Sequence, residues 1–258
     1  CQPVRRFLPS RELLARPIAA PRAPVTAAKL VFNSDAPSEF DYSVVGLAAL
    51  GTSLPLYLIS GDGIEDGLVV GVEAAVFGRF AITKITRDLI ASDWVFAVPF
   101  TRHIGQSWLQ LRYHHMSSHM GDEYILRFDS YEDAFSRDAA ELTAYHQASP
   151  GLGLYGGGSW AFNTHPDELR SLLVHAGVEA ETSDEGQVLL PYAAADVEWD
   201  QDNAWEPRLN MQIGVRLPGI EGRRSLRLAA EFLSGPAPIG QLRAERMRQL
   251  TIGLYIDP

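Results

Sequence analysis

Residues 108–123 read WLQLRYHHMSSHMGDE, and the first half of this stretch alternates between apolar and polar side chains. Leu109, Leu111 and Tyr113 fall at every second position, with polar side chains between them. Successive side chains of a β-strand point to opposite faces of the sheet, so this period predicts a strand with one apolar face. The glycine at position 121 marks the end of the strand.

Continued along the strand, the same register places His115, Ser117 and His119 on the apolar face. A polar group on an apolar surface costs free energy unless it is paired. These three side chains are therefore candidates for a function rather than for packing.

Segments of about ten residues with strand character recur through the chain, and turn-forming residues separate them. The five tryptophans fall at or near the ends of such segments, where membrane barrels carry an aromatic girdle. We therefore predict an all-β fold, a single antiparallel transmembrane β-barrel of roughly ten to twelve strands over residues 39–258.

Residues 42–61 carry no charged side chain, and their length would suit a membrane-spanning helix. Gly46, Gly51 and Pro55 interrupt this run, and a proline removes a hydrogen bond from a helix. We favour two membrane strands joined near residues 51–55, or one long kinked strand, and keep a helix as the alternative.

The chain of 258 residues has 22 basic and 32 acidic side chains, which give a net charge of -10. Nucleic-acid binding requires a basic surface, so the charge argues against a nucleic-acid partner. The mean hydropathy of -0.06 is compatible with a membrane barrel, because a polar interior offsets the lipid-facing band. We expect membrane lipid as a partner, together with other proteins of the bacterial envelope.

The first 38 residues differ in composition from the rest of the chain. They hold six of the 16 prolines, and six basic side chains against two acidic ones. Dense prolines prevent regular helix and central strand, so we expect residues 1–38 to form an extended tether outside the barrel. The single cysteine is Cys1, which is typical of a processed bacterial lipoprotein, so we expect lipidation at Cys1.

Several blocks of the sequence resemble an uncharacterised family of bacterial envelope proteins, known only as domain of unknown function number twelve-oh-seven. The blocks are residues 88–94, 113–124 and 224–232, with Gly235 and Gly240–Gln241. Many members of that family have one histidine followed by glutamine where this chain has His115-Met116. The resemblance implies an outer-membrane barrel and brings no established activity with it.

The His115-x-Ser117 pair indicates one possible chemistry. Alternate positions of a strand face the same way, so the imidazole could deprotonate the hydroxyl if a third group fixed its tautomer. Outer-membrane phospholipases and lipid A deacylases are similar, with His-x-Ser on a lipid-facing strand and Asn or Glu on the next. The third group here would be Asp129, or alternatively Asp122 or Glu123.

Two other interpretations of this region remain open. His114, His115, His119, Asp122 and Glu123 are residue types that bind divalent metals, but the strand period sends His114 to the opposite face. We therefore expect no metal or other cofactor. The alternative is a polar cluster of His114, His119, Asp122 and Glu123 that closes the barrel or contacts a partner.

Together these observations predict an outer-membrane β-barrel protein, lipidated at its N-terminus, with a structural, assembly or partner-binding role in the bacterial envelope. The alternative function is an outer-membrane lipid acyl hydrolase that uses His115 and Ser117 on a lipid-facing strand.

Overall fold

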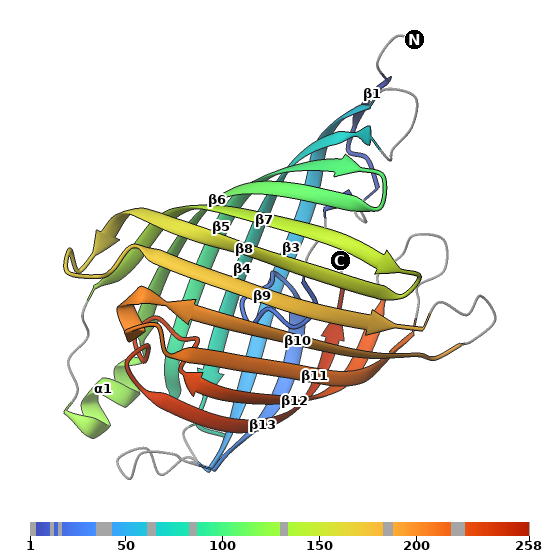
Figure 1. The fold of residues 1–258 in the computed structure, drawn as a ribbon. Coiled ribbons are helices and arrows are strands. Elements are labelled where there is room, and N and C mark those ends of the chain that lie inside the picture. Colours follow the sequence, from blue (N-terminus) through green and yellow to red (C-terminus); the bar gives the residue numbers. More distant parts are fainter. Residues whose placement is uncertain are drawn as a thin grey trace.

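The computed structural model describes residues 4–10, 13–14, 17–34, 43–60, 66–82, 87–129, 134–182, 188–217 and 225–257. Each strand from β2 to β13 pairs antiparallel with the next, and β13 pairs with β2, which closes a barrel of twelve strands (Figure 1). The predicted antiparallel barrel is confirmed. The strands are β1 (Val4–Phe7), β2 (Thr26–Asn33), β3 (Val44–Ser60), β4 (Leu68–Phe80), β5 (Leu89–Ile104), β6 (Ser107–Met120), β7 (Phe135–Ser149), β8 (Leu152–His165), β9 (Leu172–Glu181), β10 (Leu190–Asp200), β11 (Pro207–Leu217), β12 (Leu226–Pro236) and β13 (Arg246–Ile256).

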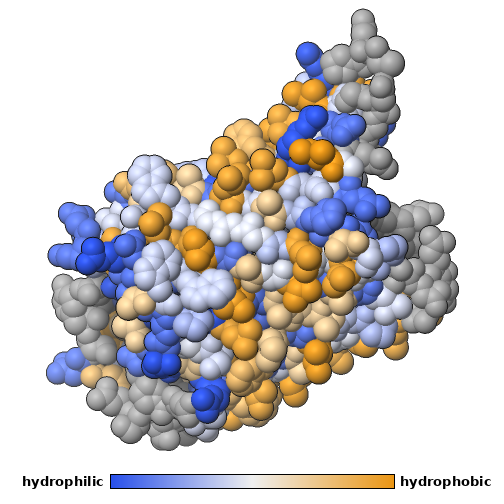
Figure 2. Space-filling view, viewed as in Figure 1, coloured by the Kyte–Doolittle hydropathy of each residue, from blue (hydrophilic) through white to orange (hydrophobic). Residues whose placement is uncertain are grey.

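The barrel wall is polar inside and apolar outside. Buried charged side chains such as Glu73, Asp196 and Glu231 line the interior, whereas Leu50 and Ile213 are 67% and 65% exposed on the exterior. Figure 2 shows one side, where hydrophobic side chains spread over the strands and hydrophilic ones gather toward the two ends of the barrel. This distribution suits a barrel surrounded by lipid.

Within the uncharged run, residues 44–60 form the single long strand β3. Its register against β4 shifts between Pro55 and Tyr57, which is a β-bulge. Leu56 has no partner on β4 at this point, and strands tolerate a proline beside such an interruption of the hydrogen-bond ladder. No helix in the described ranges is long and apolar enough to cross a membrane.

The N-terminal segment differs from the extended tether expected over residues 1–38. Strand β2 lies within it and completes the barrel between β13 and β3. The proline-free run 26–33 explains this, because the nearest preceding proline is Pro24. Strand β1 pairs with the far end of β3, beyond β2, and Cys1 lies outside the described residues.

Of the residues described between β1 and β2, residues 13–14 and 17–24 lie in the barrel interior. Leu13 and Leu14 pack against Leu58 and Val69 of the wall. Residues 17–24 are then held by polar contacts with β5, β9, β11 and the connection after β12. These contacts are Ile18 N to Glu179 Oε2 (3.0 Å), Asn210 Nδ2 to Ala19 O (2.6 Å), Arg22 Nε to Pro238 O (2.8 Å) and the ion pair Arg22–Asp93 (3.6 Å).

Helix α1 (Asp122–Phe128) and residues 237–245 cover one end of the barrel, opposite the end where the chain termini lie (Figure 1). Ala237, Ile239 and Leu242 are buried there in one cluster with Tyr124 of α1. The residue types of Tyr124–Phe128 suit a strand, but these residues lie in helix α1. The helix has acidic residues in its first turn and Arg127 in its last, and it places the rings of Tyr124 and Phe128 4.8 Å apart.

Candidate functional site

Strand β6 distributes its histidines over both faces of the wall. His115, Ser117 and His119 share the outer face with Leu109 and Leu111, as the alternation predicts. The His115 side chain is 42% exposed. His114 points inward and its side chain is only 16% exposed.

On the outer face, His115 contacts a carboxylate on the neighbouring strand. Its Nδ1 lies 2.8 Å from Asp138 Oδ1. Asp138 Oδ1 also accepts a hydrogen bond from the Tyr113 hydroxyl (2.7 Å), and Oδ2 accepts one from Asn163 Nδ2 (2.8 Å). We call Tyr113, His115, Ser117, Asp138 and Asn163 the outer polar cluster.

The strand register brings this cluster together. His115 is paired with Asp138 across β6 and β7, and Asp138 is paired with Asn163 across β7 and β8. The β7–β8 register shifts between Asp138 and Ala139, which leaves both Phe162 and Asn163 exposed. A bulge of this kind redirects a side chain, and here it turns the Asn163 amide toward the carboxylate.

Ser117 lies two residues beyond His115 on the same face, paired with Ser136 of β7. Within the described residues the Ser117 hydroxyl makes no hydrogen bond, and Nε2 of His115 is the imidazole nitrogen that does not face Asp138. Catalytic hydrogen bonds are often long before substrate binds. The outer polar cluster therefore places a serine, a histidine and a carboxylate that contacts the histidine on one face of the wall, and these are the residue types of a nucleophile, a base and a group that orients the base.

The other candidate residues lie elsewhere. Asp129 ends α1 in a left-handed conformation (φ 47°), and Asp138 is the carboxylate that reaches His115. Asp122 and Glu123 form the first turn of α1, so the structure separates them from His114, which faces the interior. Among the described residues, no group of three histidine, cysteine, aspartate or glutamate side chains could hold a metal ion.

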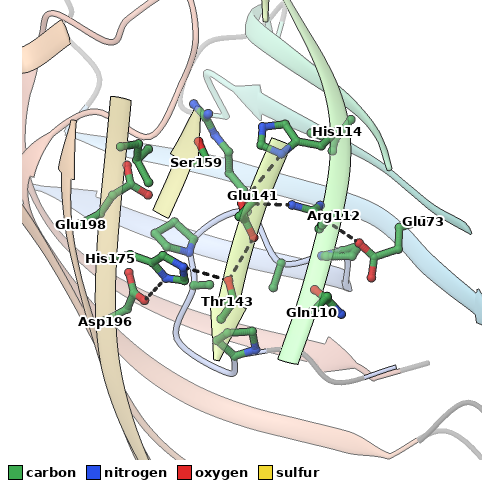
Figure 3. A pocket seen from close by; sticks show the side chains of 18 of the residues that line it. Glu73, Gln110, Arg112, His114, Glu141, Thr143, Ser159, His175, Asp196 and Glu198 are labelled. Carbon is green, nitrogen blue, oxygen red and sulfur yellow. Dashed lines mark hydrogen bonds and ion pairs between the residues drawn. The ribbon is translucent and has the colours of Figure 1, made fainter. Parts of the chain in front are cut away.

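The inner face of β6 belongs to a charged network in the barrel interior (Figure 3). Arg112 Nε donates to Glu73 Oε2 at 2.9 Å, and its Nη1 lies 3.6 Å from Glu141 Oε2. His114 Nδ1 is 3.8 Å from the same Glu141 oxygen. Ser53 of β3 donates to Glu73 at 2.8 Å, so the network joins β3, β4, β6 and β7.

The network continues around the wall through Thr143 and His175, whose Oγ1 and Nε2 are 3.2 Å apart. His175 Nδ1 lies 3.7 Å from Asp196, which also accepts a hydrogen bond from the Tyr155 hydroxyl at 2.8 Å. A cavity of about 130 Å³ lies between these side chains and residues 17–24. The interior is thus occupied by its own polar groups and by the N-terminal segment.

Asp138 and Asn163 are absent from the sequence-based site. Asp138 shares an alternate-position pattern with Ala140, Leu142 and Ala144, which marks it as a charged residue on an apolar face. That signal resembles the one at His115. The partner itself depends on the register across the connection 121–134, which the sequence does not specify.

A family model described as a protein of unknown function (DUF1207) matches residues 4–257. The outer membrane phospholipase of Salmonella typhi, a dimer with bound calcium, has a TM-score of 0.61 at 10% identity, over 96% of this chain and 96% of that chain. Outer membrane phospholipase A of Escherichia coli has a TM-score of 0.59 at 11% identity, with 96% of each chain covered. The KdgM porin has a TM-score of 0.50 at 4% identity, over 91% of this chain and 99% of that one.

No curated protein sequence matches that of the chain. At such low identities the structural similarity shows only that the chain has the fold of outer-membrane barrels.

Proposed function

We propose that this chain, which belongs to the DUF1207 family of proteins of unknown function, hydrolyses acyl esters of membrane lipids. The activity lies in the outer polar cluster. The observation that carries the proposal is the 2.8 Å contact between His115 Nδ1 and Asp138 Oδ1 on the outer face, beside Ser117. Asp138 lies on β7, the strand that follows the His115-x-Ser117 strand β6. Outer-membrane phospholipases and lipid A deacylases have Asn or Glu on the corresponding strand.

The location of the cluster supports this proposal. The outer face of a membrane barrel meets lipid, where an ionisable side chain costs free energy unless it is paired, and such side chains commonly mark a functional site. Asp138 keeps three hydrogen-bond donors there, from Tyr113, His115 and Asn163. A lipid ester is a substrate that reaches such a surface without leaving the membrane.

The barrel ends support a location of the outer polar cluster in the outer leaflet of a bacterial outer membrane. Such barrels have short turns on the periplasmic side and longer loops outside. Connections 121–134 and 237–245 lie at the α1 end, whereas 105–106 and 150–151 turn the chain at the opposite end. The α1 end would then face outward, and Ser117 lies three residues from that end of β6.

The chemistry follows from the roles of the three side chains. The Ser117 hydroxyl attacks the ester carbonyl carbon and gives its proton to Nε2 of His115, whose Nδ1–H is held by Asp138. The ester C–O bond breaks, the leaving alcohol takes that proton, and the acyl group stays on Ser117. Water, deprotonated by His115, then releases the fatty acid and restores the serine hydroxyl.

The experiment is a lipase assay on the purified full-length chain, with Ser117→Ala and a matched control, Ser136→Ala. Ser136 is the serine paired with Ser117 on the adjacent strand. We expect Ser117→Ala to lower the rate of phosphatidylethanolamine hydrolysis on the order of 10³-fold or more, and Ser136→Ala to retain the wild-type rate. Hydrolysis that survives Ser117→Ala, or an inactive wild-type chain, would exclude the proposal.

The occupied interior favours a second candidate, a structural, assembly or partner-binding role in the envelope. Residues 17–24 and 237–245 fasten the wall strands to one another through Arg22, Asp93 and Asn210. A barrel braced in this way suits a scaffold. If this role is the correct one, cells that lack the protein should have an envelope defect, and the Ser117→Ala variant should still correct that defect.

A further inference from the structure

A groove on the outer face begins at His115 and crosses three more strands. Its volume is about 540 Å³, and its lining runs through β5, β4 and β3 to the start of β2. Leu50, Trp94 and Phe96 stand beside it and are 67%, 54% and 47% exposed. The lining residues are Thr26, Leu50, Gly51, Thr52, Ala74, Ala75, Val76, Trp94, Val95, Phe96 and His115.

The register shows that the groove follows two parallel rows of outward side chains. One row is Thr52, Ala74, Phe96 and His115, which are paired in turn across β3, β4, β5 and β6. The second row, two residues further along the strands, is Leu50, Val76, Trp94 and Ser117. The rows therefore end at His115 and at Ser117, the base and the nucleophile of the proposed reaction.

We propose that this groove binds the acyl chain of the substrate lipid and presents its ester carbonyl between His115 and Ser117. The inference rests on the proposed function and specifies its substrate as a long-chain ester. In this surface, which faces lipid, His115 is the one titratable residue of the lining. Hydrocarbon is therefore the favoured occupant.

The dimensions of the groove fit one hydrocarbon chain. Two residues along a strand span roughly 6.7 Å, which is narrower than the 10–12 Å diameter of an α-helix with its side chains. From His115 to Thr52 the rows cross three interstrand spacings, about 14 Å in all.

The floor and walls give the groove a defined shape. Ala74 is the smallest side chain of its row and lies between Thr52 and Phe96. Trp94 donates its indole N–H to Ser92 Oγ at 3.3 Å, which holds the ring as a wall. Filling the position of Ala74 should therefore block the groove halfway along.

The test compares Ala74→Phe with Ala176→Phe, a matched control on the outer face of β9. The measured quantity is kcat/KM for p-nitrophenyl palmitate divided by kcat/KM for p-nitrophenyl butyrate. We expect Ala74→Phe to lower this ratio about tenfold, the effect of losing contact with roughly two methylene groups, and Ala176→Phe to leave it unchanged.

The remaining outcomes separate the two proposals. Suppose that hydrolysis requires Ser117 but that Ala74→Phe leaves the palmitate-to-butyrate ratio unchanged, or that both variants lower it equally. Either result contradicts the groove proposal and leaves the proposed hydrolase activity unaffected. If no Ser117-dependent hydrolysis exists, the hydrolase fails. In that case the groove is tested by photo-crosslinking. The Ser117→Ala variant is irradiated with phosphatidylethanolamine whose acyl chain carries a diazirine. Labelling at Trp94 and Phe96 that Ala74→Phe abolishes supports the groove, and uniform labelling overturns it.

Discussion

At the residue scale, Asp138 accepts hydrogen bonds from three side chains, and each donor can be removed separately. Asn163→Ala removes the 2.8 Å bond to Oδ2 and leaves the His115 bond to Oδ1 in place. A hydrogen bond to a charged group contributes about 1.5 kcal/mol, so we expect kcat for lipid hydrolysis to fall about tenfold as the carboxylate loses its fixed orientation.

A double-mutant cycle with Asp138→Ala provides the control. If Asn163 acts by orienting Asp138, Asn163→Ala should have no further effect on kcat once the carboxylate is gone. Additive losses in the double variant would show instead that Asn163 contacts substrate directly or supports the fold of β8.

The side of β6 to which His115 and Ser117 point follows from the alternation of apolar and polar residues alone, because Leu109, Leu111 and Tyr113 define the apolar side. Their partner could not be predicted in the same way. A hairpin that turned near Gly121 would bring Asp129 alongside His115. The chain instead forms α1, and β7 starts at Phe135, so the register selects Asp138.

At the scale of elements, Asp257 joins β12 to the chain that leaves β13. It accepts hydrogen bonds from Arg227 Nε and Nη2, both at 2.7 Å, and from Ser225 Oγ at 3.0 Å. Burial by itself raises the pKa of the Asp257 carboxyl, but the hydrogen bonds and charge of Arg227 outweigh burial and hold the pKa below its ordinary value.

This lowered pKa predicts a loss of stability in acid. A carboxyl whose folded pKa is depressed stabilises the fold above its unfolded pKa, about 3.9, and the contribution disappears as the pH falls through the folded value. We expect the free energy of unfolding at pH 7 to be about 1–3 kcal/mol higher in wild type than in Asp257→Asn. The difference should shrink below about pH 4, as measured by urea titration with tryptophan fluorescence. A difference independent of pH would contradict this role.

Elements defined by local pattern were more predictable than those defined by distant contacts. The long strand β3 follows from its uncharged, glycine-interrupted run. Helix α1 does not, since seven residues carry too short a pattern and Tyr124 is buried by Ile239 and Leu242 from the other end of the sequence. Strand β2 was likewise obscured by the prolines that precede it.

At the scale of the whole molecule, strand length, alternation and turn spacing specify a closed barrel, because each strand can satisfy its backbone in lipid only by pairing on both edges. The occupied interior was not predictable. It depends on a segment of low regularity whose side chains meet strands far away in sequence, as Arg22 meets Asp93 and Ile18 meets Glu179.

The occupied interior predicts that the wild-type protein in a planar lipid bilayer conducts no steady ionic current. Leu13→Ser, Leu14→Ser and Arg22→Ala together remove two apolar anchors and the ion pair with Asp93, so residues 17–24 should leave the interior part of the time. We expect discrete opening events in this triple variant. Leu126→Ser with Val188→Ser, at positions 84% and 76% exposed outside the barrel strands, is the control and should stay silent. Steady conductance in wild type, or a silent triple variant that still folds as a barrel, would mean that the N-terminal segment does not close the interior.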